Sequence, residues 1–91
     1  MNYRIFYTQS YIKRAEKFLK KHPDLFGQYE KTLKLLELNP FHPALKLHRL
    51  SGKFKELYSV SINISYRVTL KFLISEKKII PVDIGSHNEV Y

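Results

Sequence analysis

The residues from 83 to 91 combine an imidazole with an aromatic ring directly behind an apolar run. His87 stands two residues after Gly85 and four residues before Tyr91. Histidine is the side chain whose ordinary pKa allows proton transfer near neutral pH, and a tyrosine ring can stack on a nucleic-acid base. The pair could therefore belong to a catalytic site. The alternative is a frayed chain end whose tyrosine packs on the core.

Arg67 is a second candidate, because it lies between Tyr66 and Val68 in a predicted strand. A guanidinium group can contact two phosphate oxygens at once. The arginine therefore indicates either a phosphate site or a solvated cation paired with Asp83 or Glu56.

The segment from position 46 to position 55 has the densest group of basic residues in the chain. It also contains His48 and Phe54. It is either a solvated loop or a contact surface for an RNA backbone. We favour RNA, because an imidazole lies among the cations and Phe54 is available for stacking. The predicted RNA-binding residues are four cations of this group and one lysine of the predicted sheet: Lys46, Arg49, Lys53, Lys55 and Lys71.

Composition limits the remaining classes of function. Sixteen Lys and Arg face eight Asp and Glu in 91 residues, a formal net charge of +8, which favours polyanionic partners. The length predicts one domain over residues 1–91. Without cysteine there can be no disulfide framework and no thiolate site. His22 and His42 fall at opposite ends of a predicted helix, so we expect no metal and no cofactor.

Targeting signals and long apolar runs are not found in the sequence. The first residues lack the basic-then-apolar layout of a signal peptide. No apolar run approaches the roughly 20 residues that cross a bilayer. We therefore expect a cytoplasmic protein without membrane contact.

Two helices are predicted in the first half of the chain, after a short strand at residues 3–7. Thr8 or Ser10 can cap the first helix, Pro23 ends it, and Asp24 can cap the second. Spacings of three and four then predict two apolar stripes. These stripes comprise Tyr11, Ile12, Ala15, Phe18 and Leu19 in the first helix, and Phe26, Tyr29, Leu33 and Leu36 in the second.

The pattern changes to alternation after the Pro40–Pro43 loop, which predicts an antiparallel meander. A short strand near Leu45, Leu47 and Leu50 is expected to lead into it, and Pro81 marks an edge or a bulge. One sheet face should pack on the helices through Tyr58, Val60, Ile62, Val68, Leu70, Val82 and Ile84. The other should show Ser59, Ser61, Arg67, Thr69, Lys71 and Asp83 to solvent. The fold class is α+β: an N-terminal strand and a helical hairpin on a mainly antiparallel sheet of four to five strands.

These segments together resemble the RelE/ParE superfamily of toxins from bacterial type II toxin–antitoxin systems. The resemblance covers essentially the whole chain. It rests on the element order and on the runs at 47–52, 57–62 and 66–68. The ending from Ile84 to Tyr91 is similar to the His-plus-aromatic terminus of the RelE-like and YafQ-like mRNA interferase branch.

The resemblance implies a metal-independent endoribonuclease that cleaves messenger RNA, usually on the ribosome, and so inhibits translation. It implies that Arg67 binds the phosphate, that His87 is an acid or base, and that Tyr91 stacks or assists. His48 matches a histidine of the YafQ-like group and is the complementary acid or base. The chain departs from ribosome-dependent relatives at positions 59, 61 and 65, where it has serine and they often have Lys, His or Asp.

The implied partners are a cognate antitoxin, messenger RNA and the ribosome, with operator DNA bound only through the antitoxin complex. We expect an acidic or amphipathic antitoxin segment that covers the basic face. Two other functions fit the same fold. One is a ParE-like gyrase poison, although members of that group generally lack the terminal His and aromatic pair. The other is a nucleic-acid-binding module without catalysis.

Overall fold

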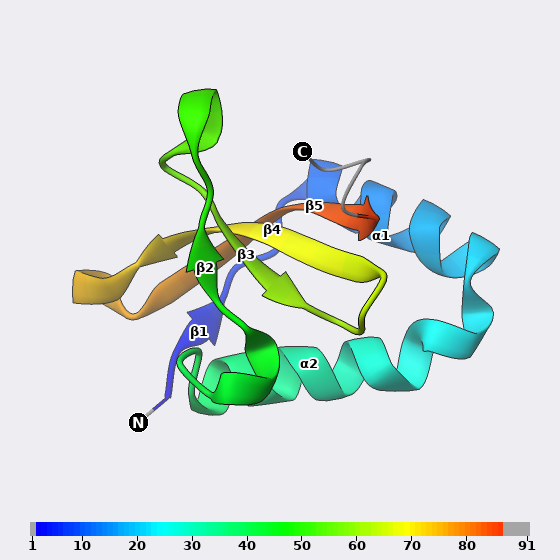
Figure 1. The fold of residues 1–91 in the computed structure, drawn as a ribbon. Coiled ribbons are helices and arrows are strands. Elements are labelled where there is room, and N and C mark those ends of the chain that lie inside the picture. The colour runs from blue at the N-terminus through cyan, green and yellow to red at the C-terminus, as the bar shows by residue number, and fades with distance from the viewer. Residues whose placement is uncertain (1, 87–91) are drawn as a thin grey trace.

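The structure is a computed structural model that describes residues 2–86, and it packs two helices on a five-stranded sheet (Figure 1). The helices are α1 (Gln9–Lys21) and α2 (Phe26–Leu38). The strands are β1 (Arg4–Ile5), β2 (His48–Arg49), β3 (Tyr58–Ser61), β4 (Tyr66–Leu73) and β5 (Lys78–Ser86). The predicted α+β fold is therefore confirmed, although the first strand is shorter than residues 3–7.

The strand order in the sheet is β1-β5-β4-β3-β2. β1 runs parallel to β5, and each of the other neighbouring pairs is antiparallel. In Figure 1, α2 passes beneath the sheet and α1 lies behind β5. Within residues 2–86, neither helix has the length and apolar character that a membrane crossing requires.

The first helix begins where the sequence predicts a cap. Thr8 is extended, and its side-chain oxygen accepts a hydrogen bond from the Tyr11 amide at 3.2 Å, which satisfies one of the free donors of the first turn. Tyr11, Ala15 and Phe18 are buried, as the stripe predicts, whereas Ile12 remains exposed.

The predicted cap of the second helix is wrong. Asp24 lies in a 3₁₀ turn (Pro23–Leu25) that leads directly into α2, and no side chain caps that helix. Because Leu25 already has helical dihedral angles, the chain has no extended residue there to act as an N-cap. Phe26 also departs from its predicted burial: half of its surface is exposed, in a groove between the two helices.

A hydrogen bond between the Tyr11 and Tyr29 hydroxyls, 2.8 Å long, joins the two helices inside the core. Burial is the main cause that raises the pKa of Tyr11, with the nearby Tyr29 second, so the pair stays protonated at neutral pH. Tyr29→Phe should lower the free energy of unfolding by about 1–2 kcal/mol, because the buried Tyr11 hydroxyl loses its partner. Tyr58→Phe is the matched control, since the Tyr58 hydroxyl has no hydrogen bond within the described residues. Urea unfolding of the two variants measures the difference, and equal stabilities would contradict the prediction.

A bulge in β5 changes which residues face the core. Thr69 pairs with Asp83 but Leu70 pairs with Pro81, so Val82 is an extra residue in the ladder. An extra residue shifts the alternation of side chains by one position. Val82 is therefore only half-buried, contrary to the predicted core, and Pro81 is buried instead. The predicted interruption at Pro81 is confirmed as a bulge.

The helices and one face of the sheet share a single hydrophobic core. Val60, Val68 and Leu70 are completely buried at its centre. This rigid layer fixes the sheet, and so it fixes the positions of the polar side chains on the opposite face.

Candidate functional site

Polar side chains from four neighbouring strands share the sheet face that does not pack on the core. His48 pairs with Ser59, Ser59 with Thr69, and Thr69 with Asp83. Directly paired residues project from the same face of a sheet. The row from Val60 through Val68 to Ile84 packs in the core. The row of Ser59, Thr69 and Asp83 is one position away on each strand, so it lies on the opposite side. We call this side the polar face.

Arg67 lies on the polar face between Ser61 of β3 and Gly85 of β5. Its guanidinium group makes no hydrogen bond or ion pair with any residue that the structure describes. Because Gly85 has no side chain, the space beside Arg67 on β5 is not filled by its strand neighbour. A half-buried cation in this position could contact a phosphate group directly.

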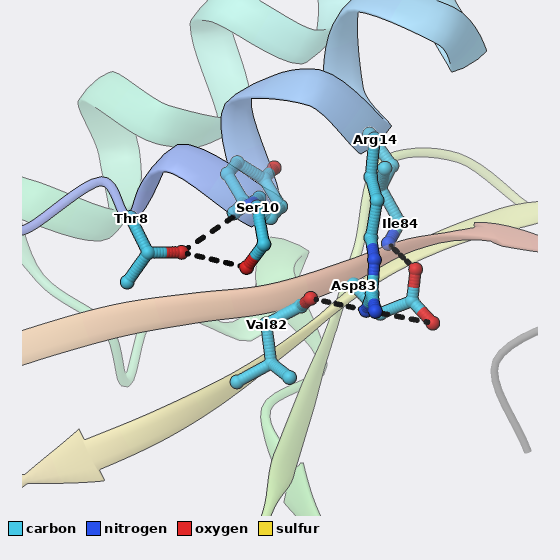
Figure 2. A network of polar contacts seen from close by, with 7 residues as sticks. Thr8, Ser10, Arg14, Val82, Asp83 and Ile84 are labelled. Atoms are coloured by element: carbon cyan, nitrogen blue, oxygen red, sulfur yellow. Dashed lines mark hydrogen bonds and ion pairs between the residues drawn. The ribbon is translucent and has the colours of Figure 1, made fainter.

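The predicted alternative for Arg67, an ion pair with Asp83 or Glu56, is not found. Asp83 lies instead beside Arg14 of α1, with Nη1 and Oδ2 3.9 Å apart (Figure 2). The other Asp83 oxygen accepts a hydrogen bond from the Ile84 amide at 2.9 Å. Arg14 also donates to the Val82 carbonyl at 3.1 Å. Arg14 could not be identified from the sequence, because nothing in its local pattern indicates a partner nearly 70 positions away.

The turn between β3 and β4 is held by Asn63, whose side-chain oxygen accepts hydrogen bonds from the Ser65 and Tyr66 amides at 2.9 Å. The Ser61 hydroxyl donates to the Asn63 carbonyl at 2.7 Å. Ser61 therefore stabilises this turn. Its bond fixes the start of β4, where Arg67 is the second residue.

Ser59 and Thr69 are buried, which contradicts the prediction that they face solvent. Both are short side chains on interior strands, so they lie below the longer side chains around them. Neither hydroxyl has a hydrogen-bond partner in the described part of the chain. Unpaired buried hydroxyls are uncommon in proteins, and this pair forms the floor of the polar face between His48 and Asp83.

His48 lies in an exposed position on β2, and its Nδ1 atom is 3.2 Å from the Lys46 carbonyl oxygen. When Nδ1 donates its proton to this oxygen, Nε2 becomes the nitrogen that can accept a proton. Lys46 has the left-handed backbone conformation, with φ of 50°, which turns the chain into β2. The structure therefore brings His48 to the polar face with one ring nitrogen oriented by the backbone.

The predicted RNA-binding cations do not form one surface. Arg49 pairs with Tyr58, so it projects from the opposite side to His48, and its Nε donates to the Lys55 carbonyl at 2.6 Å. The loop between β2 and β3, which carries Lys53 and Lys55, stands out from the sheet (Figure 1). The Lys53 ammonium lies 5.4 Å from the centre of the Phe54 ring.

Lys71 lies on the polar face, and the backbone of Lys46 contacts His48. Lys71 is two residues from Thr69 on β4, so the two side chains share the polar face, and Lys71 is exposed. Lys46 is exposed beside His48. The clustering of cations between positions 46 and 55 did not show that Arg49 projects away from His48, because successive side chains of β2 point to opposite faces.

His87 and Tyr91 lie outside the described residues. β5 ends at Ser86, which pairs with Tyr66, while Gly85 pairs with Arg67. The described chain therefore ends next to the strand segment that carries Arg67.

The other histidines have local structural contacts. The His22 ring lies 4.6 Å from the Phe18 ring and 4.8 Å from the Tyr66 ring. His42 accepts a hydrogen bond from the Ala44 amide at 3.1 Å. From residue 2 to residue 86, no three His, Asp or Glu side chains are grouped closely enough to hold a metal ion.

Comparisons with known proteins connect this geometry to one group of solved structures. No family model matches the sequence, and no curated protein matches it. YafQ from Escherichia coli BL21(DE3) superposes with a TM-score of 0.79 at 19% identity, over 98% of both chains. A chain of the E. coli DinJ–YafQ toxin–antitoxin complex gives a TM-score of 0.77 at 20% identity, over 100% of this chain and 99% of that one.

A toxin from Agrobacterium tumefaciens, described as YoeB/ParE, gives a TM-score of 0.70 at 16% identity. The match covers 92% of this chain and 98% of that chain. The three matches span nearly the full length of each protein. The chain therefore has the fold of the RelE/ParE-like toxins, and it is similar to YafQ.

Proposed function

We propose that this protein is the toxin of a type II toxin–antitoxin pair and cleaves messenger RNA as a metal-independent, ribosome-dependent endoribonuclease. The observation that carries the proposal is the placement of Arg67. It is a half-buried cation without a partner among the described residues, opposite a glycine, on the same sheet face as His48. The full-length similarity of fold to YafQ supports it.

In the proposed reaction the ribose 2′-oxygen attacks the adjacent phosphorus, and the bond from phosphorus to the 5′-oxygen breaks. His48 Nε2 accepts the proton of the 2′-hydroxyl, because Nδ1 is directed to the Lys46 carbonyl. His87 donates a proton to the leaving 5′-oxygen. The products are a 2′,3′-cyclic phosphate and a free 5′-hydroxyl.

Arg67 stabilises the negative charge that grows on the phosphoryl oxygens during this attack. Tyr91 stacks on a base and holds the RNA in line. Lys46 and Lys71 provide further positive charge at the polar face. His48, His87 and Arg67 together supply proton transfer and charge stabilisation, and the two lysines attract the RNA backbone, so the proposed chemistry needs no metal ion.

The proposed partners are messenger RNA, the ribosome and an acidic or amphipathic antitoxin. The DinJ–YafQ structure is a toxin–antitoxin complex, and the net charge of +8 on this chain would favour an acidic segment. We propose that operator DNA is bound only through the antitoxin complex. Cleavage of messenger on ribosomes would take place in the cytoplasm.

Adding the purified protein to a translating extract should produce new messenger 5′ ends, mapped by primer extension. The product of the adjacent small open reading frame, co-expressed as the antitoxin, should form a stable complex with the protein and stop the cleavage. A gyrase supercoiling assay runs in parallel. If the messenger stays intact and gyrase is inhibited, the protein is a ParE-like gyrase poison. If the protein is inactive in both assays but binds RNA, it is a nucleic-acid-binding module.

A further inference from the structure

A basic groove lies between α1 and the end of β5, at the edge of the polar face. Its volume is about 320 Å³, and its lining includes Arg14, Lys17, Lys21 and His22 on one side and Asp83 and Ile84 on the other. The described residues that line the groove include three cationic side chains, Arg14, Lys17 and Lys21, and the Asp83 carboxylate.

The two lysines of the groove have no acidic partner among residues 2–86. The Asp83 carboxylate of the groove lies beside Arg14 and accepts a hydrogen bond from the Ile84 amide. Neither Lys17 nor Lys21 forms an ion pair with any residue between 2 and 86. Four positions apart on a helix, the two lysines are neighbours, and like charges at this spacing destabilise a helix by a few tenths of a kcal/mol.

Helix electrostatics accounts for only part of this arrangement. Lys21 is in the last turn of α1, where a cation is favourable next to the helix dipole. Lys17 lies one turn earlier, where the dipole effect is weak. Repulsion between the two lysines is relieved when an anion binds between them.

Arg14 connects the helix side of the groove to β5. Its guanidinium group is held by the Val82 carbonyl and lies beside the Asp83 carboxylate, as Figure 2 shows. These contacts attach α1 to β5 at the bulge residue Val82 and at Asp83 directly after it. The contacts of Arg14 hold α1, which carries both lysines, next to β5. An extended anion can therefore lie along the groove while the helix keeps its position.

The groove adjoins the polar face. Asp83 of the groove pairs with Thr69, and two residues further along β5 Gly85 pairs with Arg67. Neighbouring strands are about 5 Å apart, so Arg67 is one strand away from this edge of β5. An RNA strand that leaves Arg67 across Gly85 would enter the groove.

We propose that this groove binds the phosphate backbone of the messenger next to the cleaved bond, with Lys17 and Lys21 contacting successive phosphates. The proposal rests on the proposed function, because it extends the path of the same RNA strand. These contacts exist before and during the reaction, so they strengthen RNA binding and lower KM without changing kcat.

The test compares the double variant K17Q/K21Q with the double variant K13Q/K20Q in the full chain. Both remove two charges from α1, but neither Lys13 nor Lys20 lines the groove; they line a second hollow together with Glu16 and Lys17. Fluorescence anisotropy measures binding of a mixed-sequence RNA in which every 2′-hydroxyl is methylated, so that the attacking group is blocked. Salt titrations are recorded for each protein.

K17Q/K21Q should weaken RNA binding several-fold. The negative slope of log affinity against log salt should become less steep by about 1.4, which corresponds to the loss of two phosphate contacts on a single strand. K13Q/K20Q should change binding much less. If both variants weaken RNA binding equally, the lysines of α1 attract RNA only through their general charge, and the proposal is wrong. If K17Q/K21Q binds the RNA like the parent but no longer binds ribosomes, the groove contacts ribosomal RNA, and the proposal is also wrong.

The outcome separates this proposal from the proposed function. If the parent protein cleaves messenger and K17Q/K21Q binds RNA like the parent, the groove proposal is wrong and the nuclease stands. If the parent neither binds nor cleaves RNA, the proposed function fails, and the groove proposal fails with it.

Discussion

Arg67→Ala is expected to slow messenger cleavage by roughly a hundredfold or more while it weakens RNA binding far less. Removing one donor that stabilises developing charge typically costs about that much in rate. The physical reason is that charge on the phosphoryl oxygens grows only in the transition state, so the lost interaction appears mainly in kcat. Single-turnover cleavage and anisotropy on the same preparations measure the two effects separately.

Lys71→Ala is the matched control for Arg67, because it removes a cation from the same strand and face. We expect it to reduce RNA affinity slightly and to leave the rate of the bound complex near that of the parent. If Arg67→Ala lowers affinity and rate by the same factor, Arg67 only attracts RNA. A lower melting temperature with full activity per folded molecule would give Arg67 a structural role instead.

Deletion of Tyr91 and the substitution His87→Ala should each abolish growth inhibition, while both proteins stay folded and still bind the antitoxin. Loss of the acid leaves the 5′-oxygen without a proton donor, and loss of the ring removes a stacking surface. The measurement is messenger cleavage during translation, with circular dichroism and antitoxin co-purification as checks of folding.

Three further variants serve as comparisons for His87→Ala and the Tyr91 deletion. His42→Ala removes an exposed imidazole that contacts only the local Ala44 amide among the described residues, and it should keep full activity. Tyr91→Phe separates the ring from the hydroxyl, and His48→Ala is expected to be milder than His87→Ala. Cleavage at the parent rate by both His87→Ala and the Tyr91 deletion would rule out the nuclease and favour the gyrase poison.

The helices and the meander could be predicted because their signals are local. Spacings of three and four defined α1, and alternation from Tyr58 onward defined the sheet. Pro81 indicated an interruption in β5, but it could not show that Val82 is the extra residue. That choice depends on how β5 pairs with β4, and pairing is not a local property of either strand.

The candidate site was predicted in part, for the same physical reason. Arg67 and His48 share a sheet face, as alternation allows, and Arg49 does not, because it follows His48 directly on β2. The burial of Ser59 and Thr69 depends on what covers them, which alternation does not reveal. The contact of Arg14 with Val82 and Asp83 joins elements from opposite halves of the chain.

The parallel pairing of β1 with β5 also determines the order in which the molecule can fold. Arg4 pairs with Lys78 and Ile5 with Ile79, so β1 has no strand partner until the chain has been made past residue 79. Contacts between such distant residues close long loops and form slowly. The helical hairpin forms from nearby residues, so we expect it to precede this closure. Arg67 of β4 meets Gly85 only when β5, the last strand, pairs with β4, so a partly synthesised chain would expose its apolar helix faces before it could bind a phosphate.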